Sequence, residues 1–576
     1  MWSLLPYAKK YQKELILGPL FKLFEAILEL ILPLYMAQLL DQAISEKNSQ
    51  LVWLLAGKML LISCLGLFFV ILCQYYASIA SQGFGTELRN QLTRKINRLS
   101  YAQLDQSNEN SLITRITNDT NQLQLALAML IRLVIRAPFL CIGSIIMAYR
   151  IEPKVTLLFI AVLPIFIAAI YMISKITMPF FKKGQQLLDQ LTHLVAENLS
   201  GIRVIRAFSK TPQQITRFDE TSDDLANTSI KAANIAAILG PVTTFVINGA
   251  ILFILYFSSF SINAGTLKQG EVIALINYMT QMLMALIVIS NLVVIFSRAE
   301  VSAKRISEIL DLPEETIADE KRMTQKIETI RFDNVAFQYP NTKKKTLAHL
   351  NFTIQEGEWL GITGPTGSGK STLIPLLTNL YPVSDGQILF NNESSAYYSS
   401  HELLSKIAIV PQKNILFSGT LRENLQMMAP DASDEEIWNA LDIAQCRSFV
   451  EELPDQLDAL VQASGKNFSG GQRQRLTIAR ALVQPKEIII FDDSFSALDY
   501  QTDFNLRQAL RNKLQQATII MISQRLSTIA EAEQILVLEQ GKILAHGTHQ
   551  TLLKESAFYL ELAKMQGLEG GFDYEK

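Results

Sequence analysis

A glycine-rich segment in the second half of the chain has the residue types and spacing of a phosphate-binding loop. Glycines let backbone N–H groups turn inward around phosphates, and the N-terminus of a following helix adds a favourable dipole. Lys370 is expected to reach the β- and γ-phosphates of ATP, and Ser371 to ligate Mg²⁺. A chance glycine-rich turn is disfavoured by the apolar run Trp359–Thr363 before the loop and the helical run Thr372–Leu380 after it. The segment matches GxxxxGK(S/T) and comprises Gly364, Pro365, Thr366, Gly367, Ser368, Gly369, Lys370 and Ser371, with Thr372 next.

A second acidic element follows further along the chain. Ile488–Phe491 is a continuous apolar run that ends in Asp492. Such a run is typical of a parallel strand that is buried on both faces. A carboxylate at the end of that strand is suited to hold Mg²⁺, through water. The loop and this carboxylate together predict a P-loop NTPase.

A third motif narrows the class. Phe468-Ser469-Gly470-Gly471-Gln472 leads into the helical run Arg473–Leu482, and Asp492 follows. Here the chain resembles the ATP-binding-cassette (ABC) family, whose signature reads LSGGQ. The resemblance implies that Ser469 and Gly471, with Gly470 and Gln472, clamp the γ-phosphate of ATP held by an opposite cassette. It therefore implies that the working form is a dimer.

Other segments fit the same resemblance in their order along the chain. Tyr339, in FQYP, resembles the aromatic residue that stacks on adenine, and Gln412, in IVPQ, resembles the Q-loop residue that contacts Mg²⁺ and the membrane domain. Ser496-Ala497-Leu498-Asp499 resembles the D-loop. Taken singly, Tyr339 or Gln412 would be ordinary surface residues, but their order within one cassette favours the functional interpretation.

Two catalytic positions depart from the family pattern. Asp493 stands where active members usually have Glu, the general base, and Asp is one methylene shorter. A base must lie within about 2.6–3.2 Å of its proton donor. Gln524, in SQR, stands where the family usually has the switch His, and an amide cannot become a cation.

These departures sit in an otherwise intact cassette, because Lys370 and the signature are unchanged. The pattern resembles the degenerate subunit of heterodimeric exporters. In that arrangement this chain's own site binds ATP and hydrolyses it poorly, while its signature completes a competent site on a non-identical partner with intact Glu and His. The alternative is a homodimer with slow hydrolysis, since Asp can sometimes serve as a base.

The chain before this cassette contains apolar segments that are long enough to span a bilayer, which takes about 20 residues. The polar segments 85–123 and 179–229 are predicted as long loops that are rich in arginine and lysine, so the positive-inside rule puts them and the N-terminus in the cytoplasm. An even number of spans then returns the chain to the cytoplasm for the cassette. The six apolar segments lie at 15–44, 51–84, 124–150, 154–178, 230–262 and 272–299.

The predicted fold is an α-helical, six-span transmembrane domain of exporter type fused to an α/β P-loop NTPase cassette with a helical signature subdomain. The segments Leu104–Asn121 and Glu197–Phe208 resemble intracellular loops of ABC exporters, and importers usually keep the two domains on separate chains. We expect the transmembrane domain at 1–310, a linker at 311–327, the cassette at 328–568 and a tail at 569–576.

Four of the charged residues inside the predicted spans are related by their spacing. Glu25 and Glu29 share one helix face, and Arg132 and Arg136 repeat that spacing. Both pairs fall in the inner leaflet, where ionisable groups usually face the bundle interior and find partners. We favour a structural Glu–Arg pairing. The alternative is a substrate site in which spare Glu charge attracts cationic drugs.

The sequence as a whole predicts a multi-pass subunit in a bacterial plasma membrane that uses ATP and Mg²⁺ to export small molecules. The favoured substrates are amphipathic, drug-like compounds, taken from the cytoplasm or the inner leaflet. A lipid or peptide exporter of the same architecture is the alternative, and no residue chooses between them. The net charge of −2 gives no support to nucleic-acid binding.

Overall fold

The structure is a computed structural model that describes residues 2–107, 109–314, 322–340 and 342–568. The chain divides into two compact units, one formed by Met1–Asn97 and Asn108–Leu312 and the other by Arg98–Ser107 and Pro313–Lys576. The predicted tail 569–576 and the middle of the predicted linker, 315–321, lie outside the described residues.

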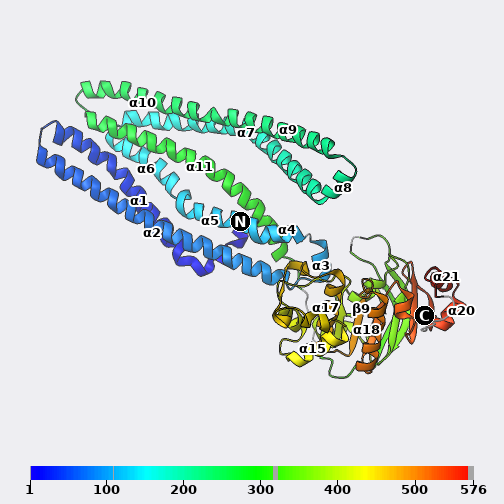
Figure 1. Ribbon diagram of the computed structural model, residues 1–576. Coiled ribbons are helices and arrows are strands. Elements are labelled where there is room, and N and C mark those ends of the chain that lie inside the picture. Colours follow the sequence, from blue (N-terminus) through cyan, green and yellow to red (C-terminus); the bar gives the residue numbers. More distant parts are fainter. Residues whose placement is uncertain (1, 108, 315–321, 341, 569–576) are drawn as a thin grey trace. The chain divides into compact units, whose positions relative to one another are not determined.

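The first unit is built from long helices, several of which run side by side (Figure 1). Side-chain caps start two of them. Asn48 accepts a hydrogen bond from the N–H of Leu51, and Glu152 caps a helix that has Pro153 at its first position. The helices are α1 (Gln12–Gln38), α2 (Ser49–Ile96), α4 (Glu109–Thr114), α5 (Thr120–Met129), α6 (Arg136–Ile151), α7 (Pro153–Ser200), α8 (Ile202–Ala207), α9 (Thr211–Ala237), α10 (Leu239–Asn263) and α11 (Gln269–Leu310).

Five helical stretches in the described part of the chain are long and apolar enough to cross a membrane. They contain the last five of the predicted spans. The first predicted span, 15–44, is also helical, as α1 and the turn Leu39–Ile44, although Lys22, Glu25 and Glu29 interrupt its apolar run. The five stretches are Ser49–Ile96, Ser111–Ile151, Pro153–Ser200, Thr211–Asn263 and Gln269–Leu310.

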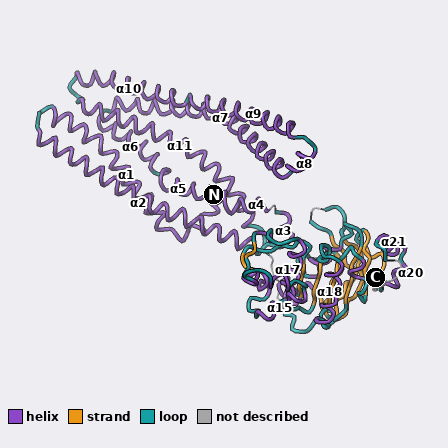
Figure 2. The backbone as a smooth tube through the Cα atoms, in the orientation of Figure 1, coloured by secondary structure: helices purple, strands orange, loops and turns teal. Residues whose placement is uncertain are grey.

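The long segments 85–123 and 179–229, which polarity alone predicts as loops, are mainly helical. Helix α2 continues to Ile96 and α7 to Ser200, while α9 already begins at Thr211. The segment 85–123 contains no proline, and continuing the helix pairs the backbone groups that an earlier end would leave open. Figure 2 shows these extensions as unbroken helix.

The second unit contains a six-stranded sheet in the order β12-β11-β3-β10-β9-β6, in which all but β12 are parallel. A separate antiparallel sheet has the order β2-β1-β4-β5, and β7 pairs with β8. The strands are β1 (Thr329–Phe337), β2 (Leu347–Gln355), β3 (Trp359–Thr363), β4 (Asp385–Phe390), β5 (Glu393–Ser394), β6 (Ile407–Val410), β7 (Gly419–Thr420), β8 (Leu460–Val461), β9 (Ile488–Asp492), β10 (Thr518–Ile522), β11 (Gln534–Glu539) and β12 (Lys542–Gly547).

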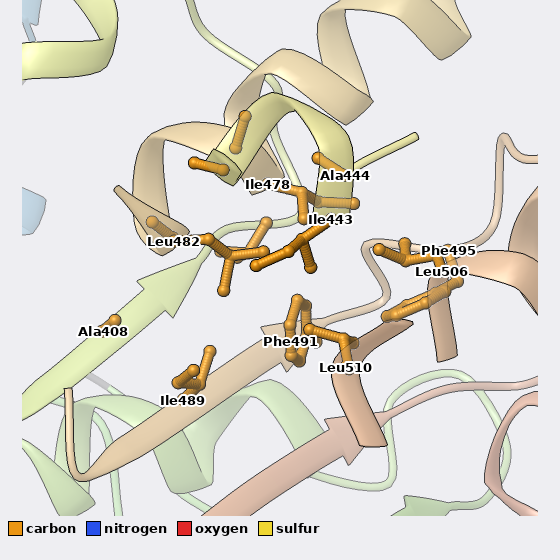
Figure 3. Packing of buried hydrophobic residues seen from close by; sticks show 14 of the residues in the cluster. Ala408, Ile443, Ala444, Ile478, Leu482, Ile489, Phe491, Phe495, Leu506 and Leu510 are labelled. Atoms are coloured by element: carbon orange, nitrogen blue, oxygen red, sulfur yellow. The ribbon is translucent and has the colours of Figure 1, made fainter. Parts of the chain in front are cut away.

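Helices surround these sheets, and the strand β9 separates two apolar cores. Ile489 and Phe491 point into one core with α17 and α18 (Figure 3), whereas Ile488 and Ile490 point into the other. This alternation is the period-two pattern of a strand buried on both faces. The helices are α3 (Tyr101–Gln106), α12 (Leu373–Leu377), α13 (Ser400–Lys406), α14 (Leu421–Leu425), α15 (Asp434–Ile443), α16 (Arg447–Glu451), α17 (Gly470–Leu482), α18 (Tyr500–Lys513), α19 (Leu526–Ile529), α20 (His549–Glu555) and α21 (Ala557–Met565).

The predicted fold class is confirmed: a helical transmembrane domain is joined to an α/β cassette. The buried run predicted at 488–491 is β9, and the helical run after FSGGQ is α17. The helical run predicted at 372–380 is shorter than expected, because α12 ends at Leu377.

Candidate functional site

The glycine-rich loop connects β3 to α12 through backbone conformations that strongly favour glycine over residues with a side chain. Gly364 has a φ of 145° and Gly369 a φ of 99°. A Cβ atom on Gly364 would lie 2.0 Å from the carbonyl oxygen of Leu538, and one on Gly369 would lie 2.6 Å from Cδ2 of Leu347. Because the loop packs this closely against its neighbours, glycine is required at both positions, and the loop has the tight curvature that a phosphate cradle needs.

Lys370 is buried at the end of this loop. Its Nζ atom donates hydrogen bonds of 2.8 Å to the carbonyl oxygens of Gly364 and Pro365. Burial lowers the pKa of Lys370, and the nearby carboxylates of Asp493 and Asp492 oppose that shift. The ammonium group is therefore held inside the curve of the loop by neutral acceptors, where phosphate oxygens can replace them.

Two oxygen ligands suited to a magnesium ion lie next to the loop. The Ser371 hydroxyl donates a 2.8 Å hydrogen bond to Oδ1 of Asp492, the last residue of β9. Burial raises the pKa of Asp492, and the hydrogen bond from Ser371 opposes this shift. Hydroxyl and carboxylate oxygens beside a phosphate site are the donors that Mg²⁺ takes, so the residues present fit the ion, which would neutralise phosphate charge.

The sequence-predicted residues come together because of the sheet order. Strands β3, β10, β9 and β6 are parallel neighbours, so their carboxyl ends lie along one edge. The phosphate loop follows β3, Gln524 follows β10, Asp493 follows β9, and Gln412 follows β6. In open α/β sheets, ligands bind at this edge.

Asp493 is the first of the two departures from the family pattern, and it lies beside the second, Gln524. Its φ of 48° is left-handed, a conformation that Asp tolerates better than most residues. Its N–H donates 2.9 Å to the carbonyl oxygen of Ile522. Burial raises the pKa of its carboxyl group, while the positive charge of Lys370, the backbone N–H of Gln524 and the side chain of Gln412 favour the charged form. Asp493 and Gln524 are thus direct neighbours.

The signature segment is a capping box at the start of α17. The Ser469 hydroxyl accepts from the N–H of Gln472 at 3.3 Å, and the Gln472 side chain accepts from the N–H of Ser469 at 2.8 Å. Ser469 and Gly470 are exposed, and a Cβ atom on Gly470 would meet nothing within 4 Å. The open N-terminus of this helix, with its positive dipole end, is suited to an anionic phosphate.

Tyr339 lies beside the phosphate loop. Its hydroxyl lies 3.2 Å from Oγ1 of Thr372, and its ring contacts the rings of Phe337 and Tyr381 edge-on. The Tyr381 hydroxyl in turn donates to the carboxylate of Asp105 in α3. The sequence did not point to Tyr381 or Asp105, because the two residues are distant along the chain and neither belongs to a motif.

Two further polar residues hold the D-loop segment. The side chain of Gln474, buried in α17, accepts a 3.2 Å hydrogen bond from the N–H of Ala497. Arg525 donates to the carbonyl oxygens of Leu498 at 2.9 Å and Ser496 at 2.7 Å. Their only signal in the sequence is their position next to the signature and the switch.

Comparisons with known proteins match both halves of the chain. Residues 15–286 match the family described as ABC transporter transmembrane region, and residues 347–496 match the family described as ABC transporter. An uncharacterised ABC transporter ATP-binding protein of Mycobacterium tuberculosis (strain CDC 1551 / Oshkosh) is 34% identical over 98% of this chain and 97% of its own. YfiB of Bacillus subtilis (strain 168), also an uncharacterised ABC transporter ATP-binding protein, is 34% identical over 99% of both chains.

Two further similarities bear on the architecture. The ATP-dependent lipid A-core flippase of Chromobacterium violaceum is 29% identical over 98% of this chain and 96% of its own. The solved structure of a bacterial Atm1-family ABC exporter with ATP bound has a TM-score of 0.81 at 23% identity, covering 97% and 99% of the two chains, and so shares the fold.

A helical membrane domain fused to a P-loop ATPase cassette defines the class, an ATP-driven exporter. The chain belongs to the ABC transporter family. Members of this class act as dimers in a lipid bilayer, and their ATPase domain implies binding of ATP with Mg²⁺.

The predicted intramembrane charges form a cluster in the first unit. Arg136 Nη2 donates to Oε1 and Oε2 of Glu29 at 3.0 and 2.7 Å, and its Nε lies 3.7 Å from Oε1 of Glu25. Lys22 Nζ lies 2.5 Å from Oε2 of Glu25. Arg132 donates instead to the hydroxyl of Ser78, at 3.1 Å.

The charge balance of this cluster bears on its role. Lys22 and Arg136 are cationic and Glu25 and Glu29 are acidic, so the charges in contact balance, while Arg132 lies against Ser78. Both carboxylates already lie beside cations. A cationic substrate would therefore meet no spare negative charge here, which favours structural pairing.

The first prediction tests this pairing. Glu29→Gln removes the carboxylate that Arg136 holds with two hydrogen bonds and leaves the guanidinium underpaired. We expect a lower melting temperature in detergent and less protein in the membrane, with transport reduced alike for cationic and neutral compounds. Glu46→Gln, in the exposed segment after α1, is the matched control. Normal stability with selective loss of cation transport would contradict structural pairing.

Proposed function

We propose that this chain is the degenerate-site subunit of a heterodimeric ABC exporter in a bacterial plasma membrane, with its cassette in the cytoplasm. Its partner is a non-identical half-exporter that carries the catalytic Glu and the switch His. The pair moves amphipathic, drug-like small molecules out of the cytoplasm or the inner leaflet. In this proposal the transmembrane domain is 1–310 and the cassette is 328–568.

The contact between Asp493 and Gln524 carries this proposal. The two substituted positions are neighbours at one edge of the sheet, so they alter one catalytic centre rather than two unrelated places. The Asp493 carboxylate is engaged by the N–H of Gln524 and the side chain of Gln412. In this proposal the Asp carboxylate, one methylene shorter than Glu, does not reach the attacking water, and loss of general-base geometry typically costs about 10²–10⁴ in rate.

The other residues of the cassette support ATP binding at two places, which are the chain's own phosphate loop and the signature segment proposed to face the partner's ATP. The phosphate loop keeps its tight curvature and its buried Lys370, and Ser371 and Asp492 supply oxygen ligands for Mg²⁺ with Gln412 nearby. Tyr339 is proposed to stack on adenine. The capping box at Ser469 presents the N-terminus of α17 to the ATP of the partner. This chain would thus bind ATP on its own loop and complete the competent site of the other subunit.

A lipid exporter of the same architecture is the second candidate. It is supported by the similarity to the lipid A-core flippase of Chromobacterium violaceum. Reconstitution into vesicles distinguishes the two candidates. ATP-dependent movement of a fluorescent phospholipid, without movement of drug-like dyes, would favour the lipid exporter.

The second prediction concerns the chain by itself. Purified without a partner, it should hydrolyse ATP at a small fraction of the assembled rate, because a site that relies on Asp493 lacks a well-placed base. The measurement is phosphate release in detergent or nanodiscs, with binding of a fluorescent ATP analogue as the control for folding. Robust turnover by the chain alone would support the slow-homodimer alternative at the expense of the heterodimer.

The third prediction separates the two nucleotide surfaces in the assembled exporter. Asp493→Asn should change ATP turnover by less than about threefold, whereas Ser469→Arg should remove most of it by filling the clamp for the γ-phosphate of the partner's ATP. Ser469→Ala is the matched control, since it loses the capping hydrogen bond without adding bulk or charge.

The relative size of these two effects on ATP turnover tests the degenerate-site proposal. If Asp493→Asn proves more damaging than Ser469→Arg, this chain carries the working base and the degenerate-site proposal fails. In the reverse direction, Asp493→Glu combined with Gln524→His restores both missing groups and should raise turnover.

A further inference from the structure

A single amide side chain at the end of α21 bridges the switch segment. Gln566 Nε2 donates 2.9 Å to the carbonyl oxygen of Gln524, and Gln566 Oε1 accepts 2.8 Å from the N–H of Leu526. The two peptide groups flank Arg525. A primary amide supplies one donor and one acceptor side by side, so Gln566 engages this segment in the way a neighbouring strand would.

The switch segment depends on this contact for one of its backbone groups. Leu526 opens α19, where the first N–H groups have no partner within the helix. The residue before it, Arg525, makes no side-chain cap to α19. Gln566 therefore caps α19 from a distant part of the chain.

Gln566 itself stands on a rigid support. Tyr559 and Ala563 of α21 are fully buried in the larger apolar core of the cassette. The Tyr559 hydroxyl lies 2.8 Å from Nδ1 of His549 in α20, which ties the two helices together. Gln566 directly follows α21, so this helix places its amide, while the segment that it holds runs from the loop after β10 into α19.

The held segment contacts both neighbouring catalytic elements. The N–H of Gln524 faces the carboxylate of Asp493, the position of the base. The guanidinium of Arg525 donates to the carbonyl oxygens of Ser496 and Leu498 in the D-loop segment. A shift of the backbone from 524 to 526 would therefore disturb both contacts at once.

We propose that Gln566 is a positioning residue for ATP turnover: it clips the C-terminal helix pair α20–α21 to the switch segment and so fixes the backbone that orients Asp493 and the D-loop. The inference goes beyond the proposed function, because it holds whether the partner chain is identical or not. Gln566 is not expected to touch the nucleotide. Its removal should thus act on kcat and leave the KM for ATP unchanged.

The fourth prediction tests this in the assembled exporter. Gln566→Ala should lower kcat about three- to tenfold, chiefly through the D-loop segment that Arg525 holds, because the proposed function leaves Asp493 itself little share of turnover. The KM for ATP should stay within about twofold. Hydrogen exchange of the peptide covering 524–528 should accelerate, with exchange in α20 and α21 unchanged.

Two matched variants complete the test. Gln566→Glu keeps the acceptor for the N–H of Leu526 but loses the donor to Gln524, so it should retain protection at Leu526 and show an intermediate kcat. Lys564→Ala, exposed on the same helix, should behave as the parent protein. Unchanged kcat in Gln566→Ala would overturn the proposal. So would faster exchange throughout α21, because Gln566 would then only stabilise the helix.

Discussion

The parallel pairing of β10 with β3 on one side and β9 on the other is the constraint on which the nucleotide site depends. In this register Ile522 lies opposite both Ile362 and Asp492. A slip of one residue would turn every side chain of a strand to the opposite face. Since β9 is buried between two apolar cores, that slip would also move Phe491 and Ile490 each into the core on the opposite face of the strand. Burial of apolar side chains thereby fixes where the polar residues at the strand ends lie.

This arrangement explains how a chain can keep nucleotide binding while its hydrolytic centre changes. The phosphate loop is set by glycine geometry against β2 and β11, and Lys370 is held by backbone carbonyl oxygens of the loop itself. None of these contacts involves the side chain of Gln524. Asp493, by contrast, contacts the end of β10 and the segment after it, through the carbonyl oxygen of Ile522 and the N–H of Gln524. Substitutions at Asp493 and Gln524 therefore change side chains at one place beside the phosphate loop and remove none of the contacts that hold Lys370 and the loop glycines.

The sequence predicted those functional features that are formed by residues adjacent along the chain. The phosphate loop, the run ending at Asp492 and the capping box at Ser469 are local patterns, and the structure has each of them as a strand end or helix start. The long polar segments were misjudged as loops because polarity also suits a helix that leaves the bilayer. Contacts between residues distant along the chain, such as Gln566 with Gln524, Tyr381 with Asp105 and Arg132 with Ser78, could not be predicted, because no spacing rule links such residues.

The position of α3 shows why these distant contacts matter for coupling. Residues 98–107 belong to the compact unit of the cassette, although the chain on both sides of them belongs to the helical unit. Asp105 accepts a hydrogen bond from Tyr381, whose ring packs on Tyr339, and the Tyr339 hydroxyl lies beside Thr372 at the end of the phosphate loop. Tyr339, Tyr381 and Asp105 thus form a continuous path of packed rings and one hydrogen bond from the phosphate loop to α3. Because α3 is covalently joined at both ends to segments of the helical unit, this path continues through the backbone into the chain that crosses the membrane.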